Sequence, residues 1–288
     1  MENVLELTNV RKNYGDFYLQ DVSFSLQEGY IMGLIGPNGA GKTTIIKLIM
    51  NLIIKNGGSI KIFDKDHCKD EVEIKSRIGF VYDNPHYYEH LNLNQIKKII
   101  APFYKNWDED MFQHLVKKFD LPHKKIIKKF SRGMVMKGAI AIALSHHADF
   151  IIMDEPTSGL DPIFRRELLD LLYDVLQNEK KSILFSTHIT SDIERIADFI
   201  TFILDGKIIF SSAKDEILEN YALIKGENAL LNEETENYCI GVRRNSFGFE
   251  ALTNNVLEAK AVFGKQIVTD RATLEDIMYF YNARRYND

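Results

Sequence analysis

A glycine-rich run from Gly36 to Thr43 carries the strongest chemical signal in this sequence. Read as Gly-Pro-Asn-Gly-Ala-Gly-Lys-Thr, it matches the phosphate-binding loop G-x-x-x-x-G-K-[ST] without a gap. Its glycines let backbone N–H groups turn toward phosphate oxygens, and the helix expected after it adds a partial positive charge. Lys42 is expected to reach the β- and γ-phosphates, and the Thr43 hydroxyl to ligate Mg²⁺. The alternative is a glycine-rich turn that holds no ligand.

Two adjacent carboxylates, Asp154 and Glu155, end a second apolar run that begins at Phe150. At the carboxyl end of a strand, Asp154 is placed to hold Mg²⁺ through water, and Glu155 to polarise an attacking water as a general base. Apolar runs that end in acids are common, so this pattern alone also fits a strand that enters a charged turn. Downstream of a phosphate loop it predicts hydrolytic chemistry.

The elements that must position these groups alternate in type over the first 210 or so residues. Apolar runs predict buried strands, and amphipathic segments between them predict helices, which together indicate an α/β sheet with helices on both faces. The expected strands are 30–35, 150–153 and 182–186, and the expected helices are 43–52 and 164–176. The opening differs, because 4–10 and 22–26 are typical of antiparallel strands. Asp205-Gly206 predicts a hairpin turn.

The region from 92 to about 147 is mostly helical in pattern and rich in paired lysines, from Lys97-Lys98 to Lys128-Lys129. It fits either a solvated helical face or a surface close to anionic lipid headgroups. After residue 212 the pattern changes to an acidic stretch, short alternating segments and a final helix. Thr273 and Asp276 resemble a capping box that opens this helix.

Composition excludes several classes of protein. Lys and Arg number 36 and Asp and Glu 41, so the net charge of −5 argues against general nucleic-acid binding. About 45% of the residues are hydrophobic, which excludes a disordered chain. Two cysteines, Cys68 and Cys239, cannot build a disulfide framework, and a reducing compartment fits them better. His67 beside Cys68, and His146-His147, lack a second pair of metal ligands and are expected to be structural.

Further motifs stand in a fixed order around the loop and the carboxylates. Phe130–Met134 precedes the acidic strand, Ser158–Asp161 follows it, and His188 comes after the next strand. The ordered set resembles the ATP-binding cassette of ABC transporters over about residues 1–212. Phe130–Met134 corresponds to the family's signature segment, Ser158–Asp161 to its D-loop, and His188 to its switch histidine. Tyr14 stands where the family stacks an aromatic ring on adenine.

This resemblance implies an α/β fold, the ABC nucleotide-binding domain: a RecA-like core, an antiparallel β subdomain and a helical subdomain at about 92–147. A small α/β appendage at 213–288 follows it. The resemblance also implies a site for ATP and Mg²⁺. Glu155 and His188 would be catalytic, and Thr43, Asp83 and Asp154 would hold the metal. The residues expected to bind the nucleotide are Tyr14, Asn38, Gly39, Ala40, Gly41, Lys42, Thr43, Thr44, Ser131, Arg132, Gly133, Asp154 and Asp161.

Several of these residues also have ordinary structural roles. His188 alone fits a structural histidine, Tyr14 a half-buried core aromatic, and Ser131 a helix cap. Two residues depart from the family pattern: Asp83 stands where glutamine is usual, and Arg132 replaces the first signature glycine. Asp83 remains a hard oxygen ligand, although it adds negative charge beside ATP. Arg132 would either add positive charge near the phosphate or point to solvent, and we favour solvent.

One cassette holds only half of each composite ATP site. The resemblance therefore implies a second ATPase subunit, identical or related, which closes with this chain around two ATP molecules head to tail. It also implies an integral membrane permease, no nucleic-acid partner, and a cytoplasmic position on the inner face of the membrane. The resemblance to ABC transporters implies that Tyr87 and Tyr88, in the loop 82–91, contact the permease; the alternative is that they cover the protein's own helical region. The Asp83 loop, the signature and the tail resemble ABC-2-type bacterial exporters of peptides, antibiotics, or lipids and glycans. The alternatives are a soluble cassette that acts on the ribosome or DNA, and an importer ATPase.

Overall fold

A computed structural model describes residues 2–179 and 181–284. The chain divides into two compact units, Met1–Ile189 with Thr201–Phe210, and Thr190–Ile200 with Ser211–Asp288. The predicted boundary at 212/213 lies close to the start of the long segment of the second unit, which also takes in the short segment 190–200. Residues 285–288 of the predicted appendage lie outside the described residues. Within the described ranges, none of the helices is both long and apolar enough to cross a bilayer.

A six-stranded sheet in the order β10-β9-β3-β8-β7-β6 supports the predicted site. The strands of this sheet are β3 (Ile31–Ile35), β6 (Ile78–Val81), β7 (Phe150–Asp154), β8 (Ser182–Thr187), β9 (Phe199–Leu204) and β10 (Lys207–Ala213). The four strands β3, β8, β7 and β6 pair in parallel. All residues of β3, β7 and β8 are buried, as expected of parallel strands that are covered on both faces. The α/β fold predicted from sequence is confirmed.

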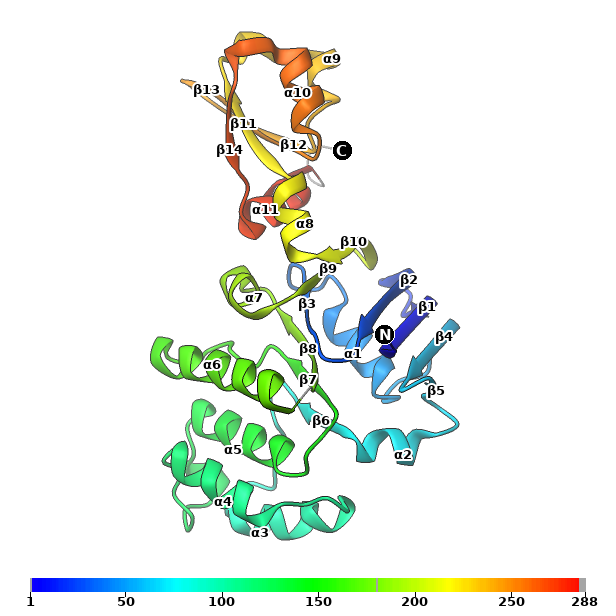
Figure 1. Cartoon of the computed structure of the whole chain (residues 1–288), viewed down its shortest axis with the longest axis vertical. Coiled ribbons are helices and arrows are strands. Elements are labelled where there is room, and N and C mark those ends of the chain that lie inside the picture. Colours follow the sequence, from blue (N-terminus) through cyan, green and yellow to red (C-terminus); the bar gives the residue numbers. More distant parts are fainter. Residues whose placement is uncertain (1, 180, 285–288) are drawn as a thin grey trace. The chain divides into compact units, whose positions relative to one another are not determined.

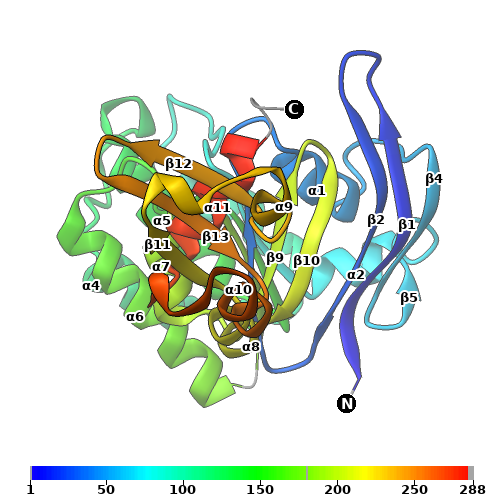
Figure 2. The same cartoon turned by 90° about the horizontal axis from the view of Figure 1, so that it is seen from above.

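Helices cover both sides of this sheet within the first unit (Figure 1). The helices and 3₁₀ turns of the unit are α1 (Lys42–Ile49), α2 (Glu71–Ser76), α3 (Leu93–Ile100), η1 (Ala101–Phe103), α4 (Glu109–Lys118), η2 (Ile127–Lys129), α5 (Arg132–Leu144) and α6 (Pro162–Glu179). Helices α1 and α2 lie on one side, and α5 and α6 on the other (Figure 2). The helix predicted over 43–52 ends earlier, at Ile49, because Asn51 adopts a left-handed backbone with φ of 50°.

A second sheet in the first unit is antiparallel, in the order β2-β1-β4-β5. Its strands are β1 (Asn3–Asn13), β2 (Tyr18–Gln27), β4 (Gly57–Ile62) and β5 (Lys65–Asp66). The pairing of β1 with β2 confirms the antiparallel opening. Leu5, Leu7 and Val10 of β1 are buried, so one face of the sheet contributes to the core.

The second unit has an antiparallel sheet of its own, in the order β12-β13-β11-β14. Its elements are α7 (Thr190–Ile196), α8 (Lys214–Asn220), β11 (Ala222–Gly226), η3 (Asn228–Leu230), α9 (Glu233–Glu236), β12 (Gly241–Asn245), β13 (Gly248–Thr253), α10 (Val256–Phe263), η4 (Gly264–Gln266), β14 (Val268–Arg271) and α11 (Leu274–Arg284). Ile224, Phe249 and Phe263 pack in its core. The capping box forms, since Thr273 and Asp276 each accept the backbone N–H of the other.

The predicted hairpin turn between β9 and β10 also supports the glycine-rich loop. Asp205 and Gly206 both have left-handed backbones, with φ of 47° and 74°. The N–H of Gly206 donates to the carbonyl of Ala40 at 3.0 Å, and the carbonyl of Gly206 accepts from the N–H of Gln20 at 2.8 Å. A Cβ atom on Gly206 would stand 2.0 Å from the carbonyl oxygen of Tyr18. Only glycine fits this position without a backbone shift.

Gly206→Ala should therefore lower the free energy of unfolding of the first unit by about 1–3 kcal/mol, through backbone strain and the clash with Tyr18. Urea unfolding followed by the fluorescence of Trp107, the one tryptophan of the chain, reports on this unit. Gly29→Ala is the matched control, because φ is 84° there but the space for a Cβ is open. It should cost only about 1 kcal/mol. Equal losses in the two variants would contradict the role of the Tyr18 contact.

Candidate functional site

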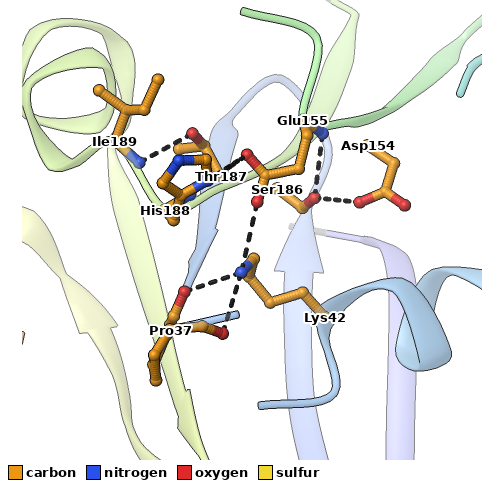
Figure 3. Close-up of polar contacts among 9 residues, drawn as sticks. Pro37, Lys42, Asp154, Glu155, Ser186, Thr187, His188 and Ile189 are labelled. Carbon is orange, nitrogen blue, oxygen red and sulfur yellow. Dashed lines mark hydrogen bonds and ion pairs between the residues drawn. The ribbon is translucent and has the colours of Figure 1, made fainter. Parts of the chain in front are cut away.

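The glycine-rich loop connects the buried strand β3 to helix α1 and closes around the ammonium of Lys42. Gly41 caps α1 in a left-handed backbone with φ of 117°, and a Cβ there would stand 2.8 Å from Leu19. Lys42 is 5% exposed. Its Nζ donates to the carbonyl of Gly36 at 2.7 Å and to that of Pro37 at 3.3 Å (Figure 3). The loop thus holds a positive charge on its inner side, beside the N-terminus of a helix.

Glu155 connects this lysine to His188. Its Oε1 lies 3.3 Å from Lys42 Nζ, and its Oε2 lies 2.8 Å from His188 Nδ1 (Figure 3). The Glu155 side chain is 14% exposed, against 40% for His188. The backbone of Glu155 is left-handed, with φ of 47°, and its N–H donates to the carbonyl of Ser186 at 3.0 Å. This strained backbone turns the carboxylate toward the loop at the end of β7.

Asp154 lies one residue earlier and is fully buried. The hydroxyl of Ser186 donates to its Oδ1 at 2.5 Å (Figure 3). Burial raises the pKa of Asp154, the hydroxyls of Ser186 and Thr43 lower it, and the charges of Asp83 and Glu155 raise it further. Its Oδ2 is buried and accepts no hydrogen bond from the described residues.

An oxygen of this kind suits a cation or a water bound to one. Thr43 and Asp83 line the cleft beside Asp154. Mg²⁺ prefers a set of hard oxygen ligands, which these three residues supply, so the residues present fit the predicted metal. Ser186 was not predicted from sequence. Its position just before Thr187-His188, at the end of a strand next to β7, is the signal that pairs it with Asp154.

Lys42, Glu155 and His188 line one cleft of about 440 Å³ in the first unit, whereas Asp154 and Ser186 are not part of its lining. Its lining includes ten of the predicted site residues: Asn38, Gly39, Gly41, Lys42, Thr43, Thr44, Asp83, Arg132, Glu155 and His188. Phe17 and Ser158 line it too and were not predicted. Ser158 stands inside the quoted D-loop run, which was a sufficient signal. Phe17 follows the β1–β2 turn, and only the folded strands bring it to Gly41.

Tyr14 and Ala40 do not line the cleft. Tyr14 is 52% exposed, so it is not a half-buried core aromatic. The ammonium of Lys12 lies over the Tyr14 ring, 4.9 Å from the ring centroid. Its contact with adenine stays a prediction, and Phe17 is the aromatic side chain that reaches the cleft. Ala40 is buried and serves through its carbonyl, which accepts from Gly206.

The signature and D-loop residues act as helix caps. The Ser131 hydroxyl caps α5 by accepting the N–H of Met134 at 3.2 Å, and Asp161 caps α6 by accepting that of Phe164 at 2.9 Å. A Cβ on Gly159 would stand 3.1 Å from the Arg132 guanidinium, so this side chain lies against the D-loop. Arg132 is exposed and also borders the cleft, so its orientation toward solvent stays a prediction. The phosphate contacts expected of Ser131 and Gly133 in a second subunit stay predictions.

Comparison with known proteins points in one direction. The family model described as ABC transporter matches residues 19–158. The bacitracin transport ATP-binding protein BcrA of Bacillus licheniformis is 36% identical over 216 residues, which cover 73% of this chain and 69% of that protein. The lantibiotic transport ATP-binding protein SrtF of Streptococcus pyogenes is 35% identical over 215 residues, which cover 74% of this chain and 92% of that protein.

Solved structures agree on the fold. The ATP-binding subunit of an ABC transporter superposes with a TM-score of 0.69 at 28% identity, covering 75% of this chain and 92% of its own. An ATP-binding cassette solved as a dimer in a post-hydrolysis state, with ADP and phosphate bound, has a TM-score of 0.65 at 23% identity. The superposition covers 73% of this chain and 98% of the cassette chain.

The buried Asp154 generates a prediction about stability. A carboxyl whose pKa is raised by folding destabilises the native state at pH values above its native pKa, because the fold disfavours its charged form. The penalty shrinks as the pH falls from that native pKa to the ordinary value, and it disappears below the ordinary value, where both states are protonated. Asp154→Asn removes the charge and keeps an acceptor for Ser186. It should therefore raise the free energy of unfolding of the ligand-free protein near neutral pH.

Urea unfolding of the wild type and of Asp154→Asn, compared near neutral pH and near the ordinary pKa of an aspartate, measures this effect. The stabilisation should shrink at the lower pH. Asp161→Asn is the matched control, since Asp161 is an exposed cap whose charge pays no burial penalty. A variant at Asp154 that is less stable than the wild type at neutral pH would contradict the account.

Proposed function

Because the chain belongs to the ABC transporter family, we propose that it is the ATP-hydrolysing subunit that powers export through a separate membrane permease. The observation that carries the proposal is the contact of Glu155 with both Lys42 and His188 at the phosphate-binding loop. The support for it is that a carboxylate, an ammonium and an imidazole line one cleft. Phosphoryl transfer to water needs little more than such positioning and electrostatic support.

The ion pair suggests an order of events in the cleft. In this structure the ammonium of Lys42 neutralises Glu155. The γ-phosphate of ATP would compete for that ammonium and leave Glu155 free to accept a proton from water. The water oxygen then bonds to the γ-phosphorus, the bond from that phosphorus to the bridging oxygen breaks, and ADP and phosphate result. His188 holds the carboxylate of Glu155 in place through its Nδ1.

We also propose that Thr43, Asp83 and Asp154 hold Mg²⁺. When bound, the metal would supply positive charge that offsets the negative charge developing on the phosphate. Asp83, in place of the usual glutamine, adds a carboxylate to this set. The support for the assignment is the buried Oδ2 of Asp154, which accepts no hydrogen bond from the described residues.

The active assembly would be a pair of ATPase subunits, this chain with a second copy or a related protein. Each phosphate loop would face the signature segment of the other subunit, where Ser131 and Gly133 would contact the γ-phosphate. Arg132 lies against Gly159 of its own D-loop. The dimeric cassette with ADP and phosphate supports this arrangement through its shared fold.

The proposed cargo is an amphipathic peptide antibiotic or a related membrane-active molecule. The support comes from two relatives named for bacitracin and lantibiotic transport. The subunit would sit on the inner face of the cell membrane, held there by its permease. Co-purification distinguishes this from a soluble cassette acting on the ribosome or DNA: the exporter subunit should purify with a membrane protein and without nucleic acid.

An apolar groove of about 700 Å³ is the surface that we assign to the permease. It is lined by Val72, Glu73, Lys75, Ser76 and Arg77, and by the segment 103–106. Val72 is 86% exposed and Phe103 is 77% exposed, and both line this groove. Large apolar side chains that are exposed together in one groove often mark an interaction site. A groove with apolar anchors and charged rims suits an amphipathic helix.

The tyrosines predicted for this contact lie elsewhere. Tyr87 and Tyr88 are not among the residues that line the groove. Burial raises the pKa of Tyr87, and the charge of Tyr104 adds to the effect, so Tyr87 covers the protein's own helical region, as the alternative interpretation had it. Tyr88 is 65% exposed. The proposed contact therefore shifts to Val72 and Phe103.

Glu155→Gln tests the proposed chemistry. The variant should lower ATP turnover by about 10²–10⁴-fold, because the amide cannot take the proton from water. ATP affinity should be no weaker than in the wild type, since the substitution releases Lys42 from its ion pair. The measurements are the ATP turnover rate, the nucleotide affinity and the molecular mass of the variant in the presence of ATP. The variant should accumulate as an ATP-bound dimer. Glu28→Gln, at an exposed position, is the control. Turnover at the wild-type rate would remove Glu155 as the base.

A double variant, Val72→Ser with Phe103→Ala, tests the groove. It should lose most of the permease in co-purification and keep the ATPase rate of the isolated chain, because neither residue lines the ATP cleft. Ile54→Ala is the control, since Ile54 is equally exposed, at 81%, and lies outside the groove. Full retention of the permease by the double variant would exclude this surface.

A further inference from the structure

Three consecutive side chains outside the ATP cleft bring together the ligand types of a transition-metal site. Asp66, His67 and Cys68 each offer one ligand atom, and these atoms all lie within 4.8 Å of one another. From sequence, His67 and Cys68 lacked further ligands and were expected to be structural. The fold supplies the third ligand by turning the chain after β5. We propose that Asp66, His67 and Cys68 bind a divalent metal ion of the zinc class.

His67 is already oriented as metal-bound histidines are. The side chain is 3% exposed, and its Nδ1 lies 3.1 Å from the carbonyl oxygen of Ile60. A carbonyl can only accept, so Nδ1 carries the proton and Nε2 of the neutral ring presents a lone pair. Metal-binding histidines usually donate their second ring N–H to a carbonyl or carboxylate in this way. The backbone of β4 therefore fixes both the tautomer and the position of the ring.

The thiol of Cys68 lies beside the imidazole ring of His67. Its Sγ is 3.5 Å from Nε2 and 3.7 Å from Nδ1, so a rotation of the exposed Cys68 side chain is needed to bring the sulfur to a metal ion on the Nε2 lone pair. A sulfur and a nitrogen bound tetrahedrally to one Zn²⁺, at bond lengths of about 2.3 and 2.05 Å, stand about 3.5 Å apart. Without metal, the same thiol can donate to that nitrogen or to the Oδ1 of Asn51, also at 3.5 Å. Metal binding would replace the thiol proton, so one proton is released for each Cys68 thiolate that binds.

Asp66 is held by the backbone that follows it. Its Oδ1 accepts the N–H of Cys68 at 3.0 Å and that of Lys69 at 3.1 Å. These two bonds fix the carboxylate over the turn that carries the other two ligands. Three protein ligands leave a fourth tetrahedral position for water, and Cys68 is exposed, so the site is open to solvent.

The surrounding charges nearly balance. Lys55 and Lys69 oppose a cation here, and the carboxylates of Asp66 and Glu71 attract one. We therefore expect weaker binding than in a closed four-ligand zinc site. The donor set is also distinct from that of the ATP cleft, where the lining contains no cysteine. This difference makes the two sites separable by spectroscopy.

Co²⁺ is the probe, because a cobalt–thiolate bond gives a charge-transfer absorption that oxygen ligands do not give. Titration of the purified full-length chain should produce this band, saturating at one Co²⁺ per chain, and Zn²⁺ should abolish it by displacement. Cys68→Ser should remove the band and remain folded, since the residue is exposed. Asp66→Asn should weaken Co²⁺ binding about ten-fold or more, in the range seen when supporting ligands are lost.

The second cysteine gives the matched control. Cys239 lies in the second unit, and its Sγ is 3.8 Å from the carbonyl of Thr235. Cys239→Ser should leave the cobalt spectrum unchanged. No charge-transfer band with the wild type, a band that survives Cys68→Ser, or a band that needs Cys239 would each overturn the proposal. ATPase activity is not the readout, so the result stands apart from the test of Glu155.

Discussion

The ion pair between Lys42 and Glu155 is the interaction on which the rest of the site depends. Both side chains are mostly buried, so each charge needs the other or a ligand that replaces it. Lys42 stands at the first position of α1, Glu155 one residue past β7, and His188 one residue past β8. The sheet order β3-β8-β7 brings these three strand ends to one edge. The parallel pairing is therefore what lets residues more than a hundred positions apart act together.

Strain at this edge is balanced by backbone hydrogen bonds. Glu155 and Gly41 both have left-handed backbones, one costly for a carboxylate residue and the other suited only to glycine. The N–H of Glu155 donates to Ser186, and the carbonyl of Ala40 accepts from the hairpin at Gly206. Neighbouring strands thus hold the loop and the carboxylate in place. The geometry of the site is a property of the whole sheet and not of the motifs alone.

Local patterns in the sequence were enough to predict the sheet and the position of the loop and the acidic strand end within it, while the chemical roles of the site residues stay predictions. Buried parallel strands have continuous apolar runs, and the motifs stand at their carboxyl ends, so strands could be predicted at 30–35 and 150–153 next to these motifs. Contacts that depend on tertiary packing could not be predicted. Phe17 reaches the cleft only because β2 lies over Gly41, and Tyr87 is covered because of the folded helical region. Asp66 joins His67 and Cys68 through a turn that no periodicity encodes.

The buried carboxylate of Asp154 has a consequence for the life of the protein in a cell. Without the proposed cation, its ionised form would weaken the fold, so metal binding and folding stability would be thermodynamically linked. Proteases act on transiently open chains in proportion to how often they open. A subunit that is short of ATP and metal would therefore open more often and be degraded sooner. Through this one side chain, cellular abundance would follow the energy supply.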